Sequence, residues 1–210
     1  HRLILTFLFI IILFGRPAVY GQRITDSLRN ELKKGHVDTV QVKLLLAFSE
    51  NQMFSNSDSA LHYANKALAL ANSIGNTAGS IVAINKVGRS YWSKGNLKDG
   101  LRYFLQSLKM AEQAQLPEFI ALNQSSIGLI FSGSGLYTKA IDYYKNALPY
   151  YLQKNNYERI AVLYNNTGKG FLNMNQTDSA EYYFLLSDSV KRLHNINLPI
   201  TSFNLADLYF

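Results

Sequence analysis

The stretch SDSALHYA at residues 57–64 returns in a closely similar form, TDSAEYYF, at residues 177–184. The two copies lie three intervals of 40 residues apart, and related residues occupy the equivalent positions in between. A chance match of one octapeptide would not place further columns of similar residues in the same register. A fixed period of this length is the sign of a solenoid or stacked array, so we interpret the chain as a repeat protein.

Several columns, each with one residue per period, carry this register. The first small column holds Ala60, Gly100, Ala140 and Ala180. One turn later a mostly aromatic column holds Ala64, Phe104, Tyr144 and Phe184, and after another turn a second small column holds Ala67, Ser107, Ala147 and Ser187. Upstream of these, a column of mostly glycine holds Phe48, Gly88, Gly128 and Gly168.

The apolar residues within one period are spaced for helices. They fall at steps of three and four at Ile81, Ile84, Val87, Gly88 and Tyr91. Gly95 then stands where a helix end favours a left-handed backbone. We predict turns inside each helix pair near residues 55, 95, 135 and 175, and longer joints near residues 75, 115, 155 and 195. No stretch alternates with period two, so the predicted fold is all-α, a right-handed superhelix of antiparallel helix pairs.

The glycines in the middle of the predicted helices have a mechanical explanation. A glycine there costs about 1 kcal/mol relative to alanine, which is tolerable where the missing side chain makes room for a neighbour. Two helices can cross closely only where small residues face the partner. We therefore expect Phe104, Tyr144 and Phe184 to fill the spaces beside Gly88 and its equivalents, and Gly128→Leu to overpack such a crossing.

These motifs resemble the tetratricopeptide repeat. The resemblance rests on the small and aromatic pair Gly88 and Tyr91, the set Ala140, Tyr144 and Ala147, and the turn Gly95, Asn96 and Leu97. It implies four repeats at about 38–76, 77–116, 117–156 and 157–197, and the truncated start of a fifth at 198–210.

The sequence departs from that family in three places. The familiar repeat has about 34 residues, whereas this one has 40, and the additional residues must lengthen the second helix or its joint. Phe48 replaces the mid-helix glycine in the first copy, as expected of an atypical terminal repeat. Pro149 lies inside the third second helix and is expected to kink it.

The first 21 residues differ in kind from the repeats. Arg2 precedes an apolar stretch from Leu3 to Phe14, which is too short to cross a bilayer. A polar break at residues 15–17 and small residues before Gln22 complete the pattern of a secretory signal peptide, cleaved before Gln22. Residues 22–37 would form a linker or first helix. We expect an exported protein, located in the periplasm or on the outer side of the inner membrane, and a sequence that is part of a longer chain.

Composition and motifs argue against catalysis. The 210-residue chain has no cysteine, which excludes disulfides and thiolate chemistry, and its net charge of +7 comes from scattered residues. The histidines are widely separated, no pair of carboxylates suggests acid–base work, and the GKG at 168–170 lacks the rest of a phosphate loop. We therefore predict no catalytic residues, no metal, no cofactor and no nucleic-acid partner.

The resemblance also implies a binding surface, because tetratricopeptide arrays generally bind extended peptides along the first helix of each pair. By position, the candidate residues are Asn85, Lys86, Arg89, Ser125, Ser126, Ser132, Asn165, Asn166, Lys169 and Asn173. The basic members of this set predict a protein or peptide partner with acidic groups. The alternative, that these residues form only a solvated polar face, stays open.

A signal peptide followed by such repeats also resembles the extracytoplasmic sensor region of Bacteroidetes-type membrane histidine kinases and related regulators. This resemblance implies that a membrane helix and a kinase or DNA-binding region follow Phe210. Two alternatives stay open: a free-standing periplasmic scaffold, and the targeting arm of an enzyme whose catalytic domain lies elsewhere in the chain.

Overall fold

A computed structural model describes residues 26–27, 30–31 and 39–196. The predicted signal peptide, most of the predicted 22–37 region and the predicted start of a fifth repeat lie outside the described residues. The chain divides between Ser93 and Lys94 into two compact units, and each unit is described by itself.

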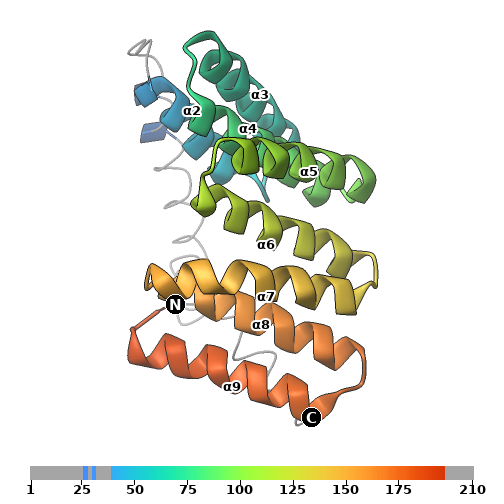
Figure 1. The fold of residues 1–210 in the computed structure, drawn as a ribbon. Coiled ribbons are helices and arrows are strands. Elements are labelled where there is room, and N and C mark those ends of the chain that lie inside the picture. Colours follow the sequence, from blue (N-terminus) through green and yellow to red (C-terminus); the bar gives the residue numbers. More distant parts are fainter. Residues whose placement is uncertain (1–25, 28–29, 32–38, 197–210) are drawn as a thin grey trace, which may run out of the picture. The chain divides into compact units, whose positions relative to one another are not determined.

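Every element among residues 39–196 is a helix, and none of these residues forms a strand. The first unit contains α2 (Thr39–Gln52), α3 (Ser57–Ser73) and α4 (Thr77–Ser93). The second unit contains α5 (Leu97–Gln113), α6 (Pro117–Gly133), α7 (Tyr137–Gln153), α8 (Tyr157–Asn173) and α9 (Thr177–Leu193). Within each unit every helix packs against the next in antiparallel fashion (Figure 1), which confirms the all-α class and the helix pairs.

The connections between helices are more regular than the sequence suggested. Each helix from α3 to α9 has 17 residues, and three residues join each to the next. The backbone is left-handed 20 residues apart along the chain, at Gly75, Gly95, Gln115, Gly135, Asn155, Asn175 and Asn195. The predicted turns are confirmed, but the expectation of longer joints between periods is wrong. The additional residues of the 40-residue period therefore lie in helix.

Local sequence explains where the helices begin. The side chains of Asn56, Asn96 and Asn156 each accept a hydrogen bond from the backbone N–H three residues later, which caps α3, α5 and α8. Pro117 opens α6, as its missing N–H allows. Helix α7 continues past Pro149 to Gln153, so this proline does not end the helix, and the kink stays a prediction.

The mid-helix glycines lie at close helix crossings. A Cβ added to Gly128 would lie 2.7 Å from the Cδ1 of Tyr144, and one added to Gly168 would lie 2.7 Å from the ring of Phe184. Both rings are buried, so the predicted pairing of glycine with an aromatic ring is confirmed for α6 with α7 and for α8 with α9.

Other parts of the predicted column pattern have different outcomes. Gly88 and Phe104 belong to different units, so their pairing stays a prediction. In the first copy the order is reversed, because the large residue Phe48 lies on the first helix and the small residue Ala64 on the second, and both are buried. The small column Ala60, Gly100, Ala140 and Ala180 is buried throughout.

Candidate peptide-binding surface

Helix α8 carries a polar stripe that faces solvent. Asn166, Lys169 and Asn173 follow one another at intervals of three and four residues, so their side chains lie along one side of the helix. Lys169 and Asn173 are exposed and Asn166 is half-buried. The Nδ2 of Asn173 donates a hydrogen bond to the carbonyl of Lys169 over 2.8 Å, which restrains the amide. This stripe is the part of the predicted surface that the structure leaves accessible.

The serines predicted on α6 turn toward their own helix and toward α7. Ser125 and Ser126 donate hydrogen bonds to the carbonyls four residues earlier, over 2.9 and 3.0 Å, and Ser126 is buried. Burial raises the pKa of Tyr151, and a hydrogen bond with Ser125 is among the opposing effects. Burial likewise raises the pKa of Tyr144, with an opposing hydrogen bond to Ser132. The hydroxyls of Ser125 and Ser132 therefore serve tyrosines of α7, and Ser126 is buried, so the expectation of an open serine surface is wrong.

Two of the predicted asparagines are inside the protein. Asn85 on α4 is 1% exposed and Asn165 on α8 is 3% exposed. We expected their amides to hold the backbone of a ligand, but at these positions neither amide can reach a molecule in solvent. The expected accessibility of both amides is therefore wrong, because both side chains are buried.

The two basic residues predicted on α4 share one carboxylate. Arg89 Nη1 lies 2.8 Å from Oε1 and 2.6 Å from Oε2 of Glu50 on α2, and Lys86 also forms an ion pair with Glu50. Burial favours the neutral form of Glu50, but the charges and hydrogen bonds of Lys86 and Arg89 outweigh it and lower the pKa of Glu50 below its usual value. The cluster links α2 to α4 and carries a net charge of one positive unit.

The sequence did not predict a role for Glu50, because all of the candidate binding residues were chosen from the second to fourth copies of the repeat. Glu50 belongs to the first copy and stands one residue beyond the position equivalent to Arg89. One turn of helix separates Lys86 from Arg89, so a single long carboxylate on the adjacent first helix can reach both. The sequence did contain a sign of this ion-pair cluster, because the acidic Glu50 stands about one period before the basic pair Lys86 and Arg89.

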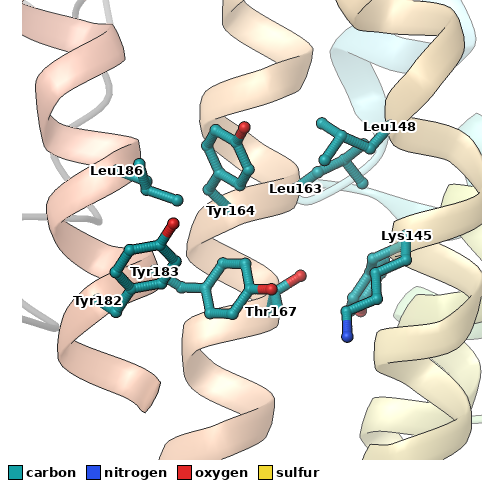
Figure 2. Close-up of a pocket in the computed structure, with 9 residues that line it drawn as sticks. Lys145, Leu148, Leu163, Tyr164, Thr167, Tyr182, Tyr183 and Leu186 are labelled. Atoms are coloured by element: carbon teal, nitrogen blue, oxygen red, sulfur yellow. The ribbon is translucent and has the colours of Figure 1, made fainter. Parts of the chain in front are cut away.

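A second feature that sequence reasoning missed is a pocket of about 210 Å³ among α7, α8 and α9. Figure 2 shows Lys145 of α7, Tyr164 and Thr167 of α8, and Tyr182 and Tyr183 of α9 around it. The rings of Tyr182 and Tyr183 meet edge to face with centroids 5.3 Å apart, and Tyr164 lies 6.2 Å from Tyr183. Burial raises the pKa of Tyr164, and Tyr182 and Tyr183 add to the effect.

Neither a metal centre nor a membrane span emerges from the part of the chain that the structure describes. Residues 39–196 and the short helical pieces before them contain no group of three His, Cys, Asp or Glu side chains placed to hold an ion. None of the described helices combines the length and apolar character needed to cross a bilayer. His62 and His194 are exposed, and His194 stacks on Tyr157 with ring centroids 3.4 Å apart.

Comparison with known proteins shows the fold and no closer relationship. No protein-family profile and no curated protein matches the sequence. A Rap protein complexed with competence and sporulation factor has a TM-score of 0.74 at 13% identity, over 86% of this chain and 52% of that one. PlcR from Bacillus thuringiensis, in complex with the peptide PapR7 and DNA, has a TM-score of 0.63 at 18% identity, over 83% and 68%.

A signal-transduction ATPase with a tetratricopeptide repeat sensor, from Pyrococcus horikoshii, has a TM-score of 0.58 at 18% identity, over 90% of this chain and 32% of that one. The chain thus spans about half of the Rap protein and a third of the ATPase. These likenesses establish a tetratricopeptide-like helical repeat fold.

Proposed function

We propose that this chain is a non-catalytic scaffold that binds an extended protein or peptide segment along the first helices of its helix pairs. The observation that carries the proposal is the polar stripe on α8, where Lys169 and Asn173 are exposed and Asn166 is half-buried. Amide groups both donate and accept hydrogen bonds, so they can pair with the backbone of an extended ligand whatever its side chains. That PlcR, a protein of similar fold, was solved with a peptide supports this reading.

The proposed ligand carries acidic groups. Lys169 is exposed on the stripe, and the chain has a net charge of +7, which favours encounter with an acidic partner. Lys86 and Arg89 already hold Glu50, so an acidic ligand at α4 would have to compete with an internal carboxylate. We therefore assign the main charge contact to Lys169 and expect the cluster on α4 to contribute less.

A peptide array tests this proposal directly. The array presents 12-residue peptides with random sequences, graded from acidic to basic composition, and is probed with the parent protein and with a Lys169→Ala, Asn173→Ala variant. The parent should favour the acidic peptides, and the variant should bind them several-fold more weakly. An exposed charge pair contributes about 1 kcal/mol or less, and each lost hydrogen bond adds a similar amount.

Lys109→Ala is the matched control, because it removes an exposed lysine from the second helix α5 without touching the stripe. Its peptide preferences should equal those of the parent. Equal binding by the stripe variant and the parent would show that the ligand uses another surface. A parent that binds no peptide would contradict the proposed function itself.

We further propose that the scaffold is exported and forms the periplasmic input region of a sensor histidine kinase or a similar regulator. The repeat sensor of the Pyrococcus horikoshii ATPase supports the combination of such repeats with signalling. The coding sequence beyond Phe210 decides the matter. A segment of about 20 apolar residues followed by a kinase or DNA-binding region supports a sensor. A stop codon favours the free-standing scaffold, and a different catalytic domain favours the targeting arm.

A further inference from the structure

The second helix of the fourth period carries apolar side chains where the earlier periods carry polar ones. The position of Tyr182 is occupied in the earlier copies by His62, Arg102 and Asp142, and that of Leu186 by Lys66, Gln106 and Asn146. The helix pair therefore forms without an apolar residue at either position. Tyr182 and Leu186 have no evident role in the repeat architecture, and a different role is needed to explain them.

These residues lie around an opening rather than in the core. Tyr182 is 59% exposed, and Leu185, one turn further along α9, is 50% exposed. Leu186 and Tyr182 line the pocket among α7, α8 and α9 on one side, and Tyr164 lines it from α8 (Figure 2). Within the second unit, the pocket and the exposed side chains of α9 beside it form one apolar surface.

The size of the pocket limits what can occupy it. At about 210 Å³ it is smaller than the roughly 300–1,000 Å³ of sites that enclose a small molecule. A space of this size suits a single large side chain. Pockets of this kind, walled by tyrosines, hold the anchoring residues of protein–protein interfaces.

The positive charge of Lys145 beside the pocket indicates which kind of partner residue would lie next to the inserted side chain. Lys145 of α7 is exposed at the opening and makes no ion pair with any residue that the structure describes. Asp142, one turn earlier, is the only acidic residue of α7. A partner carboxylate would complement this cation.

We propose that this pocket is a second docking site, separate from the stripe on α8, for a protein partner that inserts one aromatic or branched apolar side chain. The partner places an Asp or Glu, close in sequence to that side chain, against Lys145. The tyrosine rings supply the contact area, and Lys145 sets the orientation and excludes partners with a basic residue at that point.

Selection from a random 12-residue peptide library displayed on phage tests the proposal. The parent is compared with Tyr182→Arg, Leu186→Gln, a double variant with the residues that the second period carries at these positions, so its helicity should be unchanged. Peptides enriched on the parent should contain an aromatic or branched apolar residue within about three positions of Asp or Glu. Their Kd for the double variant should rise about thirty-fold, the size of an interface hot spot.

Leu105→Gln is the control, because Leu105 is an exposed leucine on the second helix α5, outside the lining of the pocket, at the position equivalent to Lys145. It should leave the Kd unchanged. Enrichment of peptides without the expected pair, equal Kd values for parent and double variant, or no enrichment at all would each overturn the proposal. Peptides that lose affinity with Lys169→Ala, Asn173→Ala instead would support the stripe and contradict the pocket, so the two sites can fail separately.

Discussion

Replacing Gly128 with alanine has two opposing effects on the stability of the protein, a gain in helix propensity and a loss from overpacking. Alanine in the middle of a helix is favoured over glycine by about 1 kcal/mol. The new methyl group would come closest to Cε1 of Tyr144 and would lie 2.7 Å from Cδ1 and 3.1 Å from Cζ, closer than ordinary van der Waals contact. Tyr144 is 1% exposed, so its ring cannot swing into solvent to make room. The outcome depends on whether α6 can move away from α7.

Overpacking a buried contact costs about 1 to 3 kcal/mol, which exceeds the gain in helix propensity. We therefore expect Gly128→Ala to destabilise the protein by about 1 kcal/mol and Gly128→Leu by considerably more. Gly168→Ala should likewise destabilise the protein. Its methyl group would meet the ring of Phe184 at 2.7 Å and also the backbone carbonyl of Ala180 at 3.1 Å, which cannot rotate away.

Gly133→Ala is the control, because we expect this substitution to stabilise the protein rather than destabilise it. This glycine is exposed at the end of α6, and its added methyl group would lie 3.7 Å from Leu97, an ordinary contact. It should stabilise the protein by a few tenths of a kcal/mol. Urea unfolding followed by circular dichroism measures all four variants, and 1 kcal/mol corresponds to about 0.5 M in the midpoint at a typical slope. A Gly128→Ala variant as stable as Gly133→Ala would refute the close crossing.

Three further predictions concern the turns, the ion-pair cluster and export. Gln115 has a left-handed backbone with φ 54°, which is costly for a residue other than glycine or asparagine, so Gln115→Gly should raise the unfolding midpoint and Asn155→Gly should raise it less. The pKa of Glu50 is lowered in the folded state from about 4.5. Its ion pairs should therefore stabilise the fold above that pH, and the stability difference between the parent and Glu50→Gln should vanish as the pH falls through the lowered pKa. In a Gram-negative host, N-terminal sequencing should find a mature chain that begins at Gln22, and an intact N-terminus in the cytoplasm would contradict export.

The architecture could be predicted because tight packing leaves a record in the sequence. A glycine opposite Tyr144 or Phe184 is needed only where two helices touch. The columns of glycine and aromatic residues therefore predicted the close helix crossings from the sequence alone. The turns were equally visible, because Gly95 and Gly135 stand where the backbone is left-handed. The equal length of the joints was not visible, since Gln115 and Asn155 adopt the same backbone without being glycine.

The candidate site was less predictable than the fold. The period fixes where a residue lies along its helix, but it does not fix which neighbouring side chains cover that residue. Asn165 and Ser125 occupy equivalent positions, yet Asn165 is buried and Ser125 is half-buried beside Tyr151. Accessibility depends on how closely the neighbouring helices approach, which is decided by side chains 20 to 40 residues away. The pocket was hidden for the same reason, since Tyr182 stands at a position that is polar in the earlier copies, and its place beside Tyr164 follows only from how the helices pack.

Hydrogen–deuterium exchange measured with and without a bound peptide tests the proposed scaffold most directly. The probe is the tightest acidic peptide from the array whose binding Lys169→Ala, Asn173→Ala weakens. If the first helices hold it, amide exchange should slow in α8, and in its neighbouring first helix α6, while α7 and α9 exchange as in the free protein. Slower exchange confined to α7 and α9, with α8 unchanged, would contradict binding along the first helices.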